Sequence, residues 1–515
     1  MEALMGIDIG STSIKAVIFD PDGNRLAKGS ASTPLSYPDP NHPAWCVWES
    51  EKVWAHTAAA IRQALSQAAS AKILGVAVTG FGMDGLPVDK DGCALYPLIS
   101  WHCPRTAPQM EKWNKKIGKY ELFAKTGKQA MAIDSVYRMM WINENHPGLL
   151  RNTDKWLLIG DFINFRLCGS RTTDYSMACT TSLFDPVHCR WSAELIRLAG
   201  IPEGIFPEPL PGGTVIGGVT RAASKDTGLK ERTPVIQGGH DYICAAFAAG
   251  AVDNSVLLDV AGTWEMTVLA SEQIEFNREL FESGYYIESH VAKGRCCFAG
   301  SAVSADMLEW FVKAYGSGEI SEGREKNTPA WDAVMQQAIS APAGANGCFF
   351  LPHFSGAGAP HIDNRSMGAF LGLSNSVGRA DSIRAIIEGL NYQFREMVEA
   401  LEDALSLKTE SIRAVGGTVR NAFWMQNKAD ILGKVIEVPE TDDATALGAA
   451  LLAGLGSGLY RNEAEAIART YRPGRSYEPD LKAFESYSGL YEDIYRKLYP
   501  ALRAINGSIF DRFKA

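Results

Sequence analysis

The sequence predicts an α/β protein made of two related domains that face each other across a cleft. The 515 residues are enough for two to four domains at about 150 residues each. Strand-like and helix-like segments alternate, which indicates layered α/β structure. A pattern of strand, acidic residue, small-residue turn and second strand opens the chain and recurs near residue 257. This recurrence places the boundary near residue 252, so the expected domains are 1–252 and 253–515.

The N-terminal region predicts a small antiparallel meander. Apolar and β-branched residues fill 4–9, 14–19 and 25–32, and turn sequences GSTS and DPDGN separate them. The periodicity then becomes helical over 53–69, and 73–79 has the character of a short buried strand.

The rest of the first half continues this alternation. Helices are expected at 136–145 and 161–167. The segment 201–217 is rich in Pro and Gly, and we interpret it as a long surface connection rather than a domain boundary. A strand at 233–237, a GGHD turn and a small-residue helix at 242–251 follow.

The segment 257–270, LLDVAGTWEMTVLA, repeats the form of MGIDIGSTSIKAVIFD at the N-terminus. The repeat places Asp259 beside Asp8 and Thr263 near Thr12. Internal duplication is the simplest explanation, and chance recurrence of a short strand-turn-strand pattern is the alternative.

Composition and charge exclude several classes of protein. The net charge of −9 and a pI near 5.6 argue against a nucleic-acid partner. The apolar stretches are shorter than the roughly 20 residues of a membrane span, and no basic segment precedes an apolar one at the N-terminus, so a cytoplasmic location is expected. The 10 cysteines include no CxxC pair, which indicates neither a zinc site nor a disulfide framework.

The first turn has the chemistry of a phosphate site. Asp8 lies in an apolar strand on the same face as two glycines, and such a carboxylate needs a cationic partner, for example a phosphate-bound metal. The GSTS turn offers backbone N–H groups and hydroxyls, and Lys15 adds a positive charge. A salt-bridged residue at a sheet edge is the alternative for Asp8.

Two familiar nucleotide motifs do not apply. The chain has no GxxxxGK[ST] sequence, which excludes the usual P-loop. GFGMDG at 80–85 matches GxGxxG, but the LPVDKDG that follows predicts a strand and a turn instead of a helix.

Two further glycine pairs end predicted strands. In GGHD, Asp241 opens a helix, where it is at least an N-cap and can also accept a hydroxyl proton at a domain junction. In AVGGTVRN, Gly416 and Gly417 permit a flat ligand to lie on the backbone, and a helix C-cap is the alternative.

Together these motifs resemble the FGGY family of carbohydrate kinases, which share the actin-like, ribonuclease H-like fold of the actin, Hsp70 and sugar-kinase group. The likeness covers nearly the whole chain, and includes SVYRMMWINEN at 135–145 and GAFLGLSNSVGRADSIRAIIE at 368–388. GFGMDG lies where xylulose kinases have a Met-His pair, which favours a ketopentose such as xylulose. The resemblance implies ATP-dependent, Mg²⁺-assisted phosphorylation of a small sugar, polyol or sugar acid.

The resemblance also implies residue roles. Asp241 is the expected base and substrate contact, and Asp8 the expected metal-side carboxylate. The expected phosphate and nucleotide ligands are Thr12, Lys15, Gly262, Thr263, Gly416, Gly417 and Asn421.

Four residues of the first half are expected to bind the sugar, because they follow strand ends that face the cleft and mix an apolar wall with polar groups: Met83, Asp84, Trp101 and His102. For two of them there are alternatives, a core position for Trp101 and a turn position for Asp84. A nucleotide-dependent sugar sensor or chaperone-like protein of the same fold is the alternative function. No nucleic-acid or membrane partner is expected, and the oligomeric state stays open, with a homodimer as one alternative.

Overall fold

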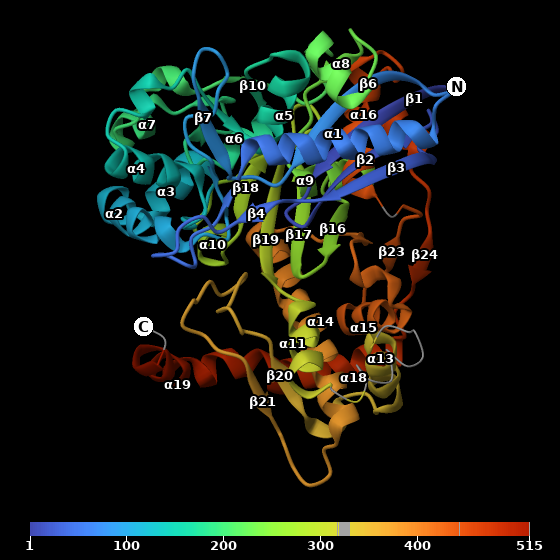
Figure 1. Cartoon of the computed structure of the whole chain (residues 1–515). Helices are drawn as coiled ribbons and strands as arrows, with labels where there is room; N and C mark the ends of the chain where they lie inside the picture. The colour runs from blue at the N-terminus through green and yellow to red at the C-terminus, as the bar shows by residue number, and fades with distance from the viewer. Residues whose placement is uncertain (317, 319–329, 442, 514–515) are drawn as a thin grey trace.

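Two β-sheets of related topology organise the molecule (Figure 1). The computed structural model describes residues 1–316, 318, 330–441 and 443–513. In the first sheet, the predicted meander is confirmed as three antiparallel strands, and two parallel strands continue the sheet from β1. In order across this sheet the strands are β14 (Val215–Gly218), β15 (Pro234–Ile236), β6 (Lys72–Gly80), β1 (Glu2–Ile9), β2 (Ser13–Phe19) and β3 (Arg25–Ser32).

The second sheet repeats this plan. Its β16, β17 and β19 are antiparallel neighbours, β22 and β23 are parallel to β16, and β24 is antiparallel at the edge. The matching strand order supports the duplication expected from sequence. Across this sheet the strands are β18 (Tyr286–Ser289), β19 (Cys296–Val303), β17 (Trp264–Ser271), β16 (Val256–Ala261), β22 (Ser411–Val415), β23 (Ile436–Val438) and β24 (Arg475–Tyr477).

Helices and short strands cover the first sheet and extend its lobe. The helices predicted at 53–69, 136–145, 161–167 and 242–251 are confirmed with shifted ends. The helices here are α1 (Ser50–Gln67), α2 (Ala107–Ile117), α3 (Lys119–Thr126), α4 (Ser135–Asn145), α5 (Ile159–Cys168), α6 (Tyr175–Cys179), α7 (Ala193–Ala199), α8 (Arg221–Thr227) and α9 (Asp241–Ala248). The short strands are β4 (Leu35–Ser36), β5 (Val47–Trp48), β7 (Gly85–Val88), β8 (Leu98–Ile99), β9 (Lys155–Leu158), β10 (Thr172–Asp174), β11 (Phe184–Asp185), β12 (Arg190–Trp191) and β13 (Glu208–Leu210).

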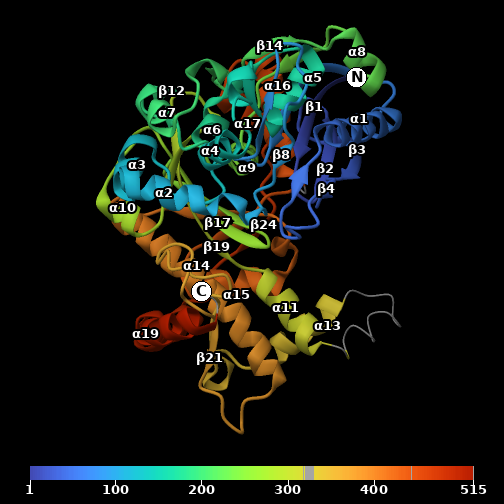
Figure 2. The same cartoon turned by 60° about the vertical axis from the view of Figure 1, so that its left-hand side comes forward.

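The second half contributes a further set of helices, several of which lie below its sheet in Figure 2. They are α10 (Arg278–Glu282), α11 (Asp306–Tyr315), α13 (Ala330–Ser340), α14 (Arg379–Ala404), α15 (Ala422–Leu432), α16 (Ala444–Gly456), α17 (Glu463–Thr470), α18 (Leu481–Leu490) and α19 (Arg496–Phe513), with the strand pair β20 (Phe349–Leu351) and β21 (Ala369–Leu371). No helix within these described residues is long and apolar enough to cross a membrane.

A shared core joins the two halves. The helices α9 and α16 contact each other, α16 packs on β1 and β6, and one apolar cluster takes residues from both sheets. Glycines permit this close approach: a Cβ atom at Gly6 would lie 1.8 Å from the carbonyl oxygen of Ala446, and one at Gly448 would lie 1.9 Å from that of Cys244. The helix from the second half is therefore seated directly on the first sheet, behind the strand that bears Asp8.

Two local expectations need correction. The segment 201–217 is more regular than a surface connection, since it contains β13 and the start of β14. Its β13 tolerates Pro209 because it belongs to a two-stranded sheet, where few backbone donors are needed. The N-cap of α9 is His240, and Asp241 is the first helical residue. The carboxylate of Asp241 still lies at the helix N-terminus, where a negative charge is favoured.

Candidate active site

The sequence-predicted residues of the first half gather at one edge of the first sheet. The strands β1, β6 and β15 run parallel, so their carboxyl ends meet there. Asp8 lies near the end of β1, the glycine run begins at the end of β6, and Gly238 to Asp241 follow β15. An isolated bridge between Gly80 and His240 joins two of these segments. This edge therefore brings Asp8, Met83 and Asp241 to one region of the fold.

Asp8 is a buried carboxylate, and the ammonium group of Lys15 lies close to it. Its side chain is 8% exposed, and the Lys15 Nζ lies 3.5 Å from its Oδ2. Burial raises the pKa of Asp8 to about 6, Lys15 opposes this rise, and the charge of Asp241 adds to it. The negative charges of Asp8 and Asp241 thus repel each other. A further cation between bound phosphates and Asp8 would stabilise the ionised form of Asp8.

The carboxylate of Asp241 is accessible to a ligand. About a third of its side chain, 32%, is exposed, in contrast to the fully buried acids elsewhere in this domain. Its Oδ1 accepts a hydrogen bond from the backbone N–H of Tyr242 at 2.6 Å, and the Nε2 of His240 lies 3.7 Å away. Burial raises the pKa of Asp241, and the neighbouring His240 counteracts the rise. This group can accept a proton from a bound hydroxyl.

Three of the four residues that are expected to bind the sugar are at least partly exposed, and the fourth, Asp84, is buried. Trp101 is half-buried and stacks on the exposed His102, with ring centroids 3.7 Å apart. Met83 is also half-buried and has a positive φ of 70°. These three can meet a ligand.

Asp84 differs from its expected place. Its side chain has no exposed surface and lies in an ion pair with the equally buried Arg138, 2.9 Å from Oδ1 to the guanidinium. Its Oδ2 accepts hydrogen bonds from the Nε1 of Trp48 at 2.7 Å and from the backbone N–H of Trp101 at 2.9 Å. Because it has no accessible surface, the Asp84 carboxylate cannot contact a ligand directly. It supports the backbone of Trp101 from behind.

The second half presents its expected residues at the matching edge of its own sheet. Thr263 is exposed in the β16–β17 turn, as Thr12 is in the β1–β2 turn. Gly416 and Gly417 are exposed just after β22, so a strand end and not a helix C-cap accounts for them. Gly416 has a φ of 112°, and a Cβ atom there would lie 2.4 Å from the Ala261 carbonyl oxygen. The turn that approaches β16 therefore requires this glycine.

Asn421 has a structural duty as well. Its Oδ1 accepts a hydrogen bond from the backbone N–H of Trp424 at 2.9 Å, which caps α15. The cap uses only the side-chain oxygen of Asn421.

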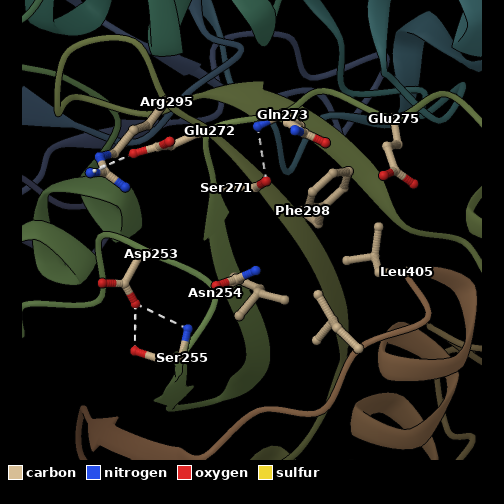
Figure 3. Close-up of a pocket in the computed structure, with 12 residues that line it drawn as sticks. Asp253, Asn254, Ser255, Ser271, Glu272, Gln273, Glu275, Arg295, Phe298 and Leu405 are labelled. Atoms are coloured by element: carbon tan, nitrogen blue, oxygen red, sulfur yellow. Dashed lines mark hydrogen bonds and ion pairs between the residues drawn. The ribbon is translucent and has the colours of Figure 1, made fainter.

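Of two cavities, one lies next to the expected phosphate-binding turn at Thr263 and the other lies away from the expected site residues. One, of about 360 Å³, lies between the halves and is lined by Gln129 and Met131 on one side and Trp264 on the other. Trp264 follows Thr263 and is 44% exposed. A second, of about 590 Å³, contains none of the expected residues (Figure 3). Its lining residues Ser255 and Ser271 stand at the ends of β16 and β17 opposite the Thr263 turn.

Sequence reasoning missed several buried partners of the site. Arg138, which forms the ion pair with Asp84, lies in the segment SVYRMMWINEN, and nothing in that segment indicates this partner. Glu288 and Lys128, which form a fully buried ion pair of 2.8 Å beside His240, gave no signal because the two lie 160 residues apart. A lone charged residue in a β-strand such as Glu288 is the one hint that the sequence offers.

Comparison with known proteins assigns the chain to a family. Residues 3–248 match the N-terminal domain model of the FGGY family of carbohydrate kinases, and residues 257–457 match its C-terminal domain model. The chain belongs to this family, and it is a carbohydrate kinase, a phosphotransferase with a hydroxyl acceptor.

Particular relatives extend over almost the whole chain. The L-fuculokinase of Escherichia coli (strain K12) is 32% identical over 485 residues, covering 93% of this chain and 98% of the relative. The xylulose kinase of Bacillus subtilis (strain 168) is 27% identical over 516 residues, covering 99% of each. The crystal structure of xylulose kinase from Rhodospirillum rubrum superposes with a TM-score of 0.87 at 27% identity, covering 98% of this chain and 99% of that one. The two-domain fold expected from the motifs is confirmed.

Proposed function

We propose that this carbohydrate kinase transfers the γ-phosphoryl group of ATP to a hydroxyl of a small sugar, with Asp241 as general base. The observation that carries the proposal is the placement of Asp241: an accessible carboxylate beside the Asp8 turn, at the edge of the sheet where Met83 also lies. The substrate hydroxyl oxygen attacks the γ-phosphorus, its proton passes to Asp241, and the bond from phosphorus to the β–γ bridging oxygen breaks to release ADP.

The phosphates are proposed to lie between the two β-hairpin turns. Thr12 and Thr263 are exposed at the tips of these turns, and Lys15 places its ammonium group beside Asp8. Hydroxyls, backbone N–H groups and one cation suit the charge of a triphosphate. Gly416, Gly417 and Asn421 would hold the adenosine, since Gly417 faces open space and a flat ring needs uncluttered backbone.

Asp8 fits a magnesium ion that is shared with the nucleotide. The described residues contain no cluster of three or more His, Cys, Asp or Glu side chains that would form a self-contained metal site. Magnesium commonly takes only one or two carboxylates together with substrate phosphates, and Asp8 supplies such a ligand. When bound, the ion would neutralise charge on the transferring phosphoryl group.

The sugar is proposed to lie against Met83, Trp101 and His102. The stacked rings supply an apolar surface for C–H groups, and the imidazole supplies a polar edge. Asp84 acts behind this wall as a positioning residue, because it holds the Trp101 backbone. A ketose is the favoured substrate class, supported by relatives that are named for L-fuculose and xylulose.

A substrate panel tests the proposal. Coupled measurement of ADP formation would compare xylulose, L-fuculose, glycerol and gluconate, each with Mg²⁺ and ATP. We expect the highest kcat/KM for a ketose and no activity above background without sugar. A preference for glycerol or gluconate would refute the ketose assignment, and sugar-independent ATP hydrolysis alone would refute phosphoryl transfer to a sugar.

A further inference from the structure

A chain of buried charges connects Asp241 to the second half of the molecule. Glu288 on β18 is fully buried, and its Oε1 accepts a hydrogen bond from the Nζ of Lys128 at 2.8 Å. Its Oε2 accepts one from the hydroxyl of Tyr242 at 2.7 Å and lies 2.9 Å from the Nδ1 of His240. The other ring nitrogen of His240 lies 3.7 Å from Asp241. One imidazole therefore stands between the second-half carboxylate and the proposed base.

The ring of His240 is closely seated. The backbone N–H of His240 donates to the Ser176 hydroxyl at 2.9 Å, and its ring meets that of Tyr242 edge to face at 4.5 Å. A Cβ atom at Gly82 would lie 2.9 Å from the Nε2 of His240 and 2.5 Å from a methyl carbon of Thr180. Gly82, the second glycine of GFGMDG, thus provides space for this imidazole, and the glycine run needs no dinucleotide to explain it.

The charges around the ring favour its protonated form. Burial lowers the pKa of His240, but the charge and hydrogen bond of Glu288, together with the charge of Asp241, more than offset burial and raise this pKa. Glu288 is held ionised in turn: burial raises its pKa, yet Lys128 and His240 together lower it to about 2. The other charged groups that act on this cluster are Asp241 and Asp174 toward His240, Asp134 toward Lys128, and Asp8 and Lys15 toward Asp241.

We infer that His240 is a positioning residue for phosphoryl transfer: Glu288 holds it as an imidazolium whose charge keeps Asp241 ionised and ready to accept the hydroxyl proton. This inference rests on the proposed role of Asp241 as base. The ionisation of Asp241 would then depend on the contact between the two halves of the molecule, because Glu288 lies on β18 of the second half. The strand β18 also contacts the first-half segment next to Lys128: the Ile287 N–H donates to the Gly127 carbonyl at 2.8 Å.

The test is the pH profile of a His240→Gln variant. Glutamine can still donate to Glu288 but has no positive charge, so protonation of Asp241 should occur at higher pH. With saturating Mg²⁺ and ATP, we expect kcat/KM for the sugar at the acidic end to fall about tenfold below wild type, and the ratio to approach one near pH 9. The matched control is His353→Gln, another buried histidine, which contacts Ser366 at 2.7 Å and should keep the wild-type profile.

A second variant guards against misfolding of the first. Glu288→Gln combined with Lys128→Met removes both members of the buried ion pair without leaving either charge alone. It should shift the acidic limb in the same direction, and His240→Gln added to it should shift the limb no further.

The outcomes separate this inference from the proposal beneath it. An Asp241→Asn variant with wild-type turnover would refute Asp241 as the base. If Asp241→Asn is inactive but His240→Gln has the acidic limb of the wild type, with rates lowered equally at every pH, Asp241 keeps its role and the inference about His240 is refuted.

Discussion

The buried pair of Arg138 and Asp84 gives a prediction that connects stability with sugar binding. Both side chains are fully buried, and the Arg138→Met substitution would leave Asp84 without its cation. Removing one partner of a buried ion pair costs about 3–5 kcal/mol, and we expect the lower part of this range because Trp48 and the Trp101 backbone still donate to the carboxylate. The double variant Arg138→Met, Asp84→Asn removes both charges and should recover more than half of the loss.

Urea unfolding followed by tryptophan fluorescence measures this difference, and steady-state kinetics measures its effect on function. The single variant should have a lower unfolding midpoint than the double variant. It should also lose kcat/KM for the sugar while the KM for ATP changes little, because Asp84 holds Trp101 and not the nucleotide turns. If the single variant is as stable as the double variant, or if the ATP KM rises as much as the sugar KM, the reasoning about this pair is refuted.

Other substitutions test the remaining parts of the site. Asp8→Ala should be inactive yet folded, with an unchanged or higher Tm, since it removes a desolvated carboxylate; a variant that unfolds would assign Asp8 a structural role. Because burial raises the pKa of Asp8 to about 6 in the protein without metal, a proton should compete with Mg²⁺ for this carboxylate, so the Kd for Mg²⁺ should rise as the pH drops below about 6, while a Kd that is constant from pH 7 to 5 would contradict this. Lys428→Met would leave Asp259 and Glu265 buried without their shared cation and should cost about 3–5 kcal/mol, a loss that urea unfolding at pH 7 would detect and that should shrink at pH 5, where Asp259, whose pKa burial raises, binds a proton. Gly448→Ala forces a Cβ atom against the backbone of α9 and should lower the Tm by several degrees, whereas the wild-type Tm would show that the helices can separate freely.

Local chemistry made much of the fold predictable. The N-terminal meander follows from β-branched runs separated by turn residues, and its recurrence in the second half predicted the paired sheets. The boundary near residue 252 stays a prediction. The strand β13 and the start of β14 within 201–217 were not predicted, because short strands at a sheet edge depend on a neighbouring strand, such as β10 for β13, more than on their own sequence pattern.

The contacts of the site between residues far apart in the sequence could not be predicted from the sequence. Sequence motifs placed Asp8 and Asp241 at strand ends, and strand direction was enough to bring them to one edge. The burial of Asp84 could not be foreseen, since its partner Arg138 lies 54 positions away on α4. The contact of His240 with Glu288 likewise arises only when the two sheets come together.

The most direct test of the central claim is the turnover of Asp241→Asn with the preferred sugar of the panel. The substitution keeps the size of the side chain and removes its basicity. We expect kcat to fall by about 10² to 10⁴, while nucleotide affinity and Tm stay near wild type. Near-normal kcat in a correctly folded variant would contradict the claim that Asp241 accepts the proton of the attacking hydroxyl. Asp241 would then have only a structural role, as the first residue of α9.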